Sequence, residues 1–337
     1  MNNDVNARLV SEIFRLSAQS SAGWPLSGSY IFAGPDFSGR TRAAEDFVLS
    51  IFCARRTVDN QPCRQCQTCR QIKAASWPDV WQLELAADKK NISLDEVRWL
   101  LEKLSRGSLL GSYQVALIRQ ADSLSLNAAN ALLKTMEEPA SRALVILLVQ
   151  DLDNLPATLV SRSRLFIFRP SAKEFVYNRL VSLVGKHAQA RELAALAGGW
   201  PDLAQHLIDQ PEILAGRQQA AACLISAVSQ DANDRLAALD KLLAKAAGQE
   251  VLTRALSILS EWRLVVRDWL MIGLGQRDLV SHQGFLPALE TSRPLLANGK
   301  LLAVYRSWQQ AKSFVAANVN PRLVLENFIL NFDNYVQ

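Results

Sequence analysis

Residues 34–41 constrain the fold of this chain more than any other stretch. Their sequence, GPDFSGRT, has the length and glycine spacing of a phosphate-binding P-loop, G-x-x-x-x-G-K-[ST], with one substitution. The apolar run at residues 30–33 is typical of a buried strand, and residues 42–49 are typical of a helix. A strand, a glycine loop and a helix in this order place backbone N–H groups around a phosphate. We therefore predict a P-loop fold; the loop alone is also compatible with a chance glycine match in an ordinary turn.

The one substitution falls on the residue that contacts phosphate directly. A P-loop lysine is a compact charge that reaches the β- and γ-phosphates, and Arg40 takes its place here. The guanidinium group is larger and planar, so this replacement is not conservative. We predict a nucleotide-binding fold whose own site has degenerated. Gly34, Gly39, Arg40 and Thr41 are the residues that would hold any nucleotide still bound.

Four of the five cysteines crowd into a short segment after the P-loop helix. They are Cys53, Cys63, Cys66 and Cys69, and the last three follow the spacing C-x-x-C-x-x-C. Four thiolates close a tetrahedral shell with no open position, which is typical of a structural zinc site. Reduced free thiols and an iron–sulfur cluster are the alternatives. Cys223 stands alone in a helical stretch, where we expect a buried, small apolar residue.

Strands alternate with helices over the first half of the chain, and helices alone follow. The expected strands are residues 30–33, 80–85, 114–118, 143–149 and 164–168. This alternation predicts a mostly parallel sheet with helices on both faces. We predict three domains: an α/β domain with the cysteine module at residues 1–169, a small helical domain at 170–209, and an all-α domain at 210–337. A separate helical domain of this length is expected to serve as an assembly surface.

Composition and charge exclude several classes of protein. The formal net charge of +5 suits a neighbour of nucleic acid but is too small to predict nucleic-acid binding by itself. The first residues lack a basic region followed by an apolar run, and the longest apolar run, residues 143–149, is too short to span a bilayer. We expect a cytoplasmic protein with no membrane partner. Its three histidines are scattered over helical regions, which gives no indication of a catalytic triad.

Two further motifs carry a resemblance to a known family. Residues 125–139, SLNAANALLKTMEEP, resemble the most recognisable segment of the AAA+ clamp-loader subunits, and residues 155–163, LPATLVSRS, are similar to the SRC motif of the same family. The cysteine cluster is similar to the zinc module of the bacterial subunits, which belong to DNA polymerase III. Together with residues 78–79 and the closing helix, the resemblance spans the whole chain.

This resemblance implies a fold and a set of partners. The fold is an α/β AAA+ domain, RecA-like with a P-loop and a zinc module, followed by a small helical lid and an all-α collar. Such subunits form a hetero-pentameric ring that opens the sliding clamp and places it on primed DNA. The implied partners are ATPase subunits and a delta subunit, with the clamp and primed DNA reached through the complex. The chain would thus be a component of a DNA-directed DNA polymerase holoenzyme.

The sequence departs from an active ATPase of this family at four places. Arg40 replaces the P-loop lysine, and Arg119-Gln120 replaces the acidic pair that holds Mg²⁺ after the third strand. The sensor position after the strand at residues 143–149 is Gln150, and the lid arginine would fall near Asp202. We predict that the isolated chain does not hydrolyse ATP. The sequence leaves open whether it binds ATP weakly.

Arg162 is retained where an active neighbour would need it. The resemblance implies that the SRC arginine projects into the ATP site of the adjacent subunit, where a guanidinium can be worth roughly 10³–10⁵ in rate. Ser163 stands in place of the SRC cysteine, and we expect this exchange to matter little. The alternative for Arg162 is a solvated arginine on a loop.

Two other functions stay open at the level of sequence. The chain could be an active AAA+ ATPase with an atypical P-loop, in which Asp122 serves as the acidic residue. It could also be a zinc-module DNA-binding protein, although the basic pairs at residues 55–56 and 89–90 are short for a nucleic-acid patch.

Overall fold

The computed structural model describes residues 5–21, 26, 28–86, 89–110, 113–138, 142–244, 249–296, 300–317 and 319–334. The chain divides into two compact units, Met1–Ala172 and Lys173–Gln337. None of the described helices combines the length and apolarity needed to cross a bilayer. Because no observation tests the predicted domain limits at 169/170 and 209/210, these limits stay predictions.

A five-stranded parallel sheet organises the first unit. Its order is β2-β3-β4-β1-β5, and each neighbouring pair is parallel. The strands are β1 (Gly28–Ala33), β2 (Val80–Leu83), β3 (Gln114–Ile118), β4 (Ala143–Val149) and β5 (Ser163–Ile167). Every residue of β3 and β4 is buried, as expected for a parallel sheet covered on both faces. The predicted parallel sheet is confirmed.

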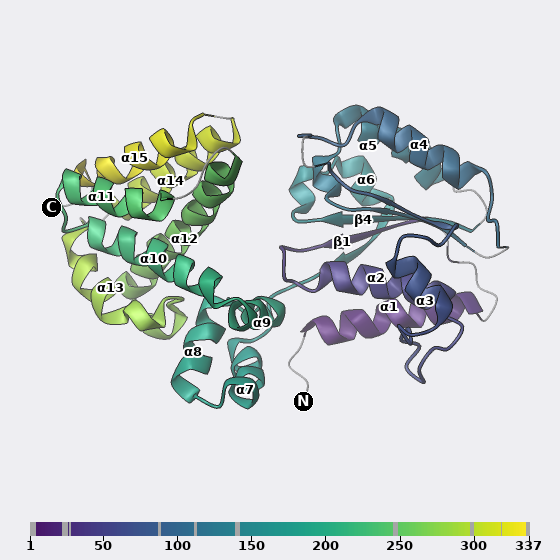
Figure 1. Cartoon of the computed structure of the whole chain (residues 1–337), viewed down its shortest axis with the longest axis horizontal. Helices are drawn as coiled ribbons and strands as arrows, with labels where there is room; N and C mark the ends of the chain where they lie inside the picture. The colour runs from purple at the N-terminus through teal and green to yellow at the C-terminus, as the bar shows by residue number, and fades with distance from the viewer. Residues whose placement is uncertain are drawn as a thin grey trace. The chain divides into compact units, whose positions relative to one another are not determined.

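Helices cover the two faces of this sheet as separate layers (Figure 1). One layer holds α1 (Val5–Ser21), α2 (Arg40–Phe52) and α3 (Gln67–Lys73), and the other holds α4 (Leu94–Ser105), α5 (Leu126–Glu137) and α6 (Ala157–Ser161). Alternate residues of β1 point to opposite layers. Phe32 packs on Phe47 of α2, with ring centroids 6.1 Å apart, whereas Ile31 joins the cluster under α4 and α5.

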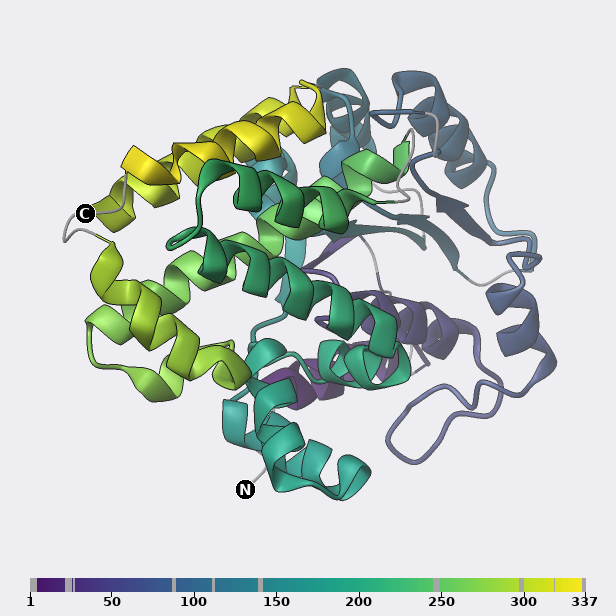
Figure 2. The same ribbon diagram turned by 60° about the vertical axis from the view of Figure 1, so that its left-hand side comes forward.

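The second unit is entirely helical within its described residues. It begins with α7 (Lys173–Val184), α8 (His187–Leu196) and α9 (Pro201–Asp209), which bury a small apolar core of their own. It continues with α10 (Pro211–Ala227), α11 (Ala232–Leu243), α12 (Gln249–Gly273), α13 (Leu286–Ser292), α14 (Lys300–Ala316) and α15 (Pro321–Leu330). In both views α14 and α15 lie side by side (Figures 1 and 2).

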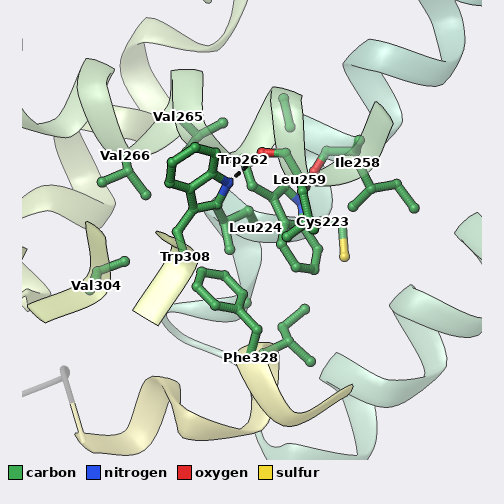
Figure 3. Close-up of a cluster of buried hydrophobic side chains, with 14 of the residues drawn as sticks. Cys223, Leu224, Ile258, Leu259, Trp262, Val265, Val266, Val304, Trp308 and Phe328 are labelled. Atoms are coloured by element: carbon green, nitrogen blue, oxygen red, sulfur yellow. Dashed lines mark hydrogen bonds between the residues drawn. The ribbon is translucent and has the colours of Figure 1, made fainter. Parts of the chain in front are cut away.

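The long helix α12 is the centre of the larger core in this unit. Its Trp262 is fully buried, donates its indole N–H to the Ala220 carbonyl at 3.0 Å and stacks on Phe328 at 5.2 Å (Figure 3). Trp308 of α14 donates in the same way to the Leu259 carbonyl at 2.7 Å. Because each indole N–H has an acceptor, two large side chains enter the core without an unpaired donor. Cys223 lies in the same cluster, and burial raises the pKa of its thiol to about 12.

Three buried charged side chains and one partly exposed arginine form a chain of contacts beside this core. His282 contacts Glu261 through Nε2 and Asp268 through Nδ1, each at 2.7 Å, and Arg217 donates to Glu261 at 2.7 Å. Asp268 also accepts the backbone N–H groups of Ser281 and His282. Burial alone would lower the pKa of His282, but Asp268 and Glu261 raise it to about 9. The histidine is therefore a structural cation that joins α12 to the segment after it.

We expect this network to make stability depend on pH. The pKa of His282 is about 9 in the folded protein and about 6.5 in the unfolded chain. The contribution of His282 to the free energy of unfolding is therefore complete below pH 6.5 and is lost as pH rises through 9. The shift corresponds to a loss on the order of 3 kcal/mol. Urea unfolding between pH 6 and pH 10 measures it, with His282→Gln as the variant and the exposed His187→Gln as the control. If the free energy of unfolding depended on pH in the same way in the wild type and in His282→Gln, His282 would not be the structural cation.

Candidate functional site

The loop at residues 34–41 has the backbone of a P-loop between β1 and α2. A β-carbon added to Gly34 would lie 2.9 Å from the Ser38 hydroxyl and 3.0 Å from Cβ of Phe168, so the close approach of these segments requires glycine. Gly39 precedes α2 with φ at 85°, a left-handed conformation that favours glycine. Thr41 lies in the first turn of α2 and is partly exposed. The structure thus brings the four predicted P-loop residues together.

Arg40 does not extend from this loop. Its side chain is 6% exposed, and its Nη2 donates to Asp36 Oδ1 at 3.0 Å within the same loop. Asp36 Oδ2 accepts from the Gln150 side chain at 2.9 Å. The predicted sensor residue therefore contacts the P-loop, but its partner is a carboxylate of the protein. An exposed carboxylate inside the loop also repels phosphate.

Asp122 completes a network of opposite charges around Arg40. Burial lowers the pKa of the Arg40 guanidinium, and the carboxylates of Asp36 and Asp122 act in the opposite direction. Asp122 Oδ2 accepts the backbone N–H of Gln150 at 3.3 Å. Arginine remains charged at any pH that proteins tolerate, so these two carboxylates balance it. The carboxylate that could serve as an acidic residue of an active site therefore lies close enough to Arg40 to influence its charge, and its recorded hydrogen bond is to the Gln150 backbone.

Arg119 occupies the end of β3, where the acidic pair was expected. Its Nη2 donates to Glu45 Oε1 of α2 at 2.5 Å and to the Gln82 side chain of β2 at 3.3 Å. Gln120 follows with φ at 52°. The position that would hold Mg²⁺ through a carboxylate thus carries a cation anchored between a helix and a strand. Asp202 lies in the other unit, in the first turn of α9.

The four predicted zinc ligands come together at the ends of two helices. Cys53 caps the C-terminus of α2, Cys66 caps the N-terminus of α3 and Cys69 lies inside α3. All four Sγ atoms lie within 4.8 Å of one another, and those of Cys53 and Cys63 are 3.6 Å apart. A tetrahedral ion with metal–sulfur bonds of about 2.3 Å requires sulfurs about 3.8 Å apart, so this set fits a single zinc ion.

Backbone N–H groups point at two of these sulfurs and favour the thiolate of Cys63. The N–H of Cys63 points at Cys53 Sγ, and the N–H of Cys66 points at Cys63 Sγ, at 3.4 and 3.3 Å. Backbone N–H groups of Gln65 and Cys66 lower the pKa of Cys63 to about 6. Thiolate is the form of cysteine that binds metal. Burial raises the pKa of Cys53 and Cys69, so backbone hydrogen bonds alone do not make all four thiols thiolates, and the closeness of the four sulfurs is the observation that favours a metal ion.

Arg162 lies at a turn between α6 and β5, on the first unit. Its Nε donates to Glu137 Oε1 at 2.6 Å, its Nη1 donates to the Thr158 carbonyl at 3.3 Å, and its side chain remains 40% exposed. Ser163 ties the turn down because its hydroxyl lies 2.8 Å from the Leu159 carbonyl and 3.1 Å from the Ser29 hydroxyl. We expected the exchange of cysteine for Ser163 to matter little; the structure gives this serine an anchoring role.

Sequence reasoning did not identify the partner of Arg162. Glu137 closes α5, which is the helix of the recognisable segment at residues 125–139. Pro139, the last residue of that segment, lies outside the described residues. Glu137 and Arg162 are 25 positions apart, and no local pattern connects them. The only indication in the sequence was that the two motifs of the resemblance, residues 125–139 and 155–163, contain Glu137 and Arg162 respectively.

The sheet order, the P-loop between β1 and α2, and the helical second unit define an AAA+ protein. A family model described as DNA polymerase III, delta subunit, matches residues 11–172. The chain is 25% identical over 326 residues to the delta' subunit of DNA polymerase III from Bacillus subtilis, with 90% of each chain covered. It is 27% identical over 310 residues to the delta' subunit from Pseudomonas aeruginosa, covering 90% of this chain and 91% of the relative.

A longer relative matches only in part. The tau subunit of DNA polymerase III from Bacillus subtilis is 32% identical over 214 residues, which cover 61% of this chain but 37% of tau. These similarities confirm the resemblance predicted from the sequence. The chain is similar to DNA polymerase III clamp-loader subunits: the family model matches 162 of its 337 residues, and its similarity over nearly the full length is to delta' subunits.

Proposed function

We propose that this chain is a clamp-loader subunit that does not hydrolyse ATP and that supplies Arg162 to the ATP site of a neighbouring ATPase subunit. It would act in a hetero-pentameric ring with ATPase subunits and a delta subunit, which loads the sliding clamp on primed DNA. The observation that carries the proposal is the internal neutralisation of Arg40 by Asp36, at 3.0 Å within the P-loop.

The chemistry of phosphoryl transfer explains why this arrangement would not turn over. An active site needs a free cation at the β- and γ-phosphates and a carboxylate that binds Mg²⁺. Here Arg40 is buried and paired, and Arg119 brings a positive charge to the metal position. A Mg²⁺ ion placed beside Arg119 would be repelled. Both halves of the nucleotide site therefore lack the group that the reaction requires.

Arg162 has the properties that a finger acting on another subunit would need. It is 40% exposed, whereas Arg40 is buried. Its backbone is fixed because the Ser29 hydroxyl donates to the Arg162 carbonyl at 2.9 Å. An exposed guanidinium on a fixed turn can enter the site of a neighbour with little reorganisation, which is the condition for electrostatic stabilisation of a transition state.

Nucleotide titration tests the degenerate site. We expect a fluorescent, non-hydrolysable ATP analogue with Mg²⁺ to show no saturable binding to the purified chain up to millimolar concentration. Competent ATPase subunits of the same loader serve as the positive control. Arg40→Ala should not create binding, since Asp36 and Arg119 remain. Micromolar affinity that requires Mg²⁺ would contradict the proposal and favour an active ATPase with an atypical P-loop.

We further propose that Cys53, Cys63, Cys66 and Cys69 hold a structural zinc ion. Four thiolates fill a tetrahedral shell, so no position remains for a substrate or an activated water. The ion would join the end of α2 to the start of α3. Arg64 supports the same connection by donating from Nε and Nη2 to the two oxygens of Asp46, at 3.0 and 2.5 Å.

A further inference from the structure

The contact between Glu137 and Arg162 gives Glu137 a place in the proposed reaction. Glu137 is the last residue of α5. A carboxylate at a helix C-terminus meets the negative end of the helix dipole, which is unfavourable without a nearby cation. Arg162 Nε supplies that cation at 2.6 Å, although both side chains are half-exposed. This position favours an ion pair over a fully solvated glutamate.

The geometry of the ion pair determines which N–H groups of Arg162 remain free for another acceptor. Guanidinium carries five N–H groups: one on Nε and two on each Nη. Glu137 takes the Nε group, and the Thr158 carbonyl takes one on Nη1. Nη2 has no hydrogen-bond partner in the described part of the chain. The contacts therefore use Nε and one N–H of Nη1, and they leave both N–H groups of Nη2 and the second N–H of Nη1 for another acceptor.

We propose that Glu137 is a positioning residue for Arg162: it holds the guanidinium so that the Nη groups face the γ-phosphate of ATP in the neighbouring subunit. The inference rests on the proposed function of Arg162. An unrestrained arginine must lose about 2 kcal/mol of rotamer entropy on ordering. An Arg162 side chain that is already hydrogen-bonded to Glu137 through Nε loses less rotamer entropy when it binds phosphate. Glu137 itself touches no substrate.

The neighbouring Glu138 provides a matched control. It is exposed, directly follows Glu137, and makes no side-chain hydrogen bond or ion pair within the residues that the structure describes. Loss of its charge changes the net charge of this surface as Glu137→Ala does. It leaves the Arg162 contact in place. A difference between the two variants therefore reports on the contact and not on the local charge.

The test measures kcat and KM for ATP in a reconstituted clamp loader in which only the subunit facing Arg162 can hydrolyse ATP. We expect Glu137→Ala to lower kcat about two- to fivefold with little change in KM, since an exposed ion pair contributes modestly. Glu137→Gln should keep part of the rate because its amide oxygen still accepts from Nε. Glu138→Ala should match the wild type. Size-exclusion chromatography verifies that each variant assembles.

A double variant separates this inference from the proposed function. Combined with Arg162→Ala, Glu137→Ala should have no further effect, because a positioning residue acts only through its partner. Additive losses, a loss equal to that of Glu138→Ala, or a rate raised by Glu137→Ala would each overturn the inference. So would a normal rate for Glu137→Ala when Arg162→Ala is slow. If Arg162→Ala itself is normal, the proposed function fails and the inference falls with it.

Discussion

Arg162→Ala should slow ATP hydrolysis at the one site that this chain faces by about 10³-fold or more, the range in which an arginine finger acts. The reason is electrostatic: charge develops on the transferred phosphoryl group, and a fixed guanidinium stabilises it more than it stabilises bound ATP. We therefore expect kcat to fall with KM for ATP changed much less. The measurement needs a reconstituted loader in which only the facing subunit can hydrolyse ATP.

Two variants sharpen this experiment. Arg162→Lys keeps the positive charge but loses the planar fork, so it should recover only part of the rate. Arg164→Ala removes a nearby arginine that pairs with Glu12 and lies over the Phe166 ring, and it should turn over normally. Wild-type turnover by an assembled Arg162→Ala loader would show that this arginine is not a finger.

Removal of zinc should unfold the cysteine module. Closed zinc sites contribute on the order of 10 kcal/mol to local folding, and residues 53–66 include no helix or strand of their own. We expect one zinc per chain in wild-type protein by elemental analysis and much less in Cys69→Ser. Hydrogen exchange over residues 53–73 should become rapid in that variant and after chelation, while the strands β3 and β4 keep their protection.

Cys223→Ser is the matched control for the zinc experiment. Cys223 is also buried, but it lies in the second unit among apolar side chains. This variant should keep its zinc and its exchange pattern in the module. Wild-type protein prepared without chelators that contains no zinc, or a Cys69→Ser module that stays protected, would show that the four thiols need no ion.

Local patterns determined the main features of the first unit. Buried runs such as β4, which lie between helices, identify a parallel sheet because both of its faces must be apolar. The spacing of Gly34 and Gly39 predicts the loop because no other residue takes these backbone positions without strain. Cysteine spacing likewise predicts one cluster, since three of the ligands lie within seven residues. In each case the physical cause acts over a few positions of the chain.

Tertiary structure decided which charges meet. The sequence shows that Arg40 replaces lysine, but only the fold brings Gln150 from the end of β4 to Asp36 of the P-loop, 114 positions away. The partners of Arg162 and His282 are likewise long-range choices, at 25 and 14–21 positions. A charged side chain has no periodicity that names its partner, because pairing depends on which elements the packed core places side by side. The sequence therefore identifies the charged residues themselves, and the packing of the folded chain determines which of them pair.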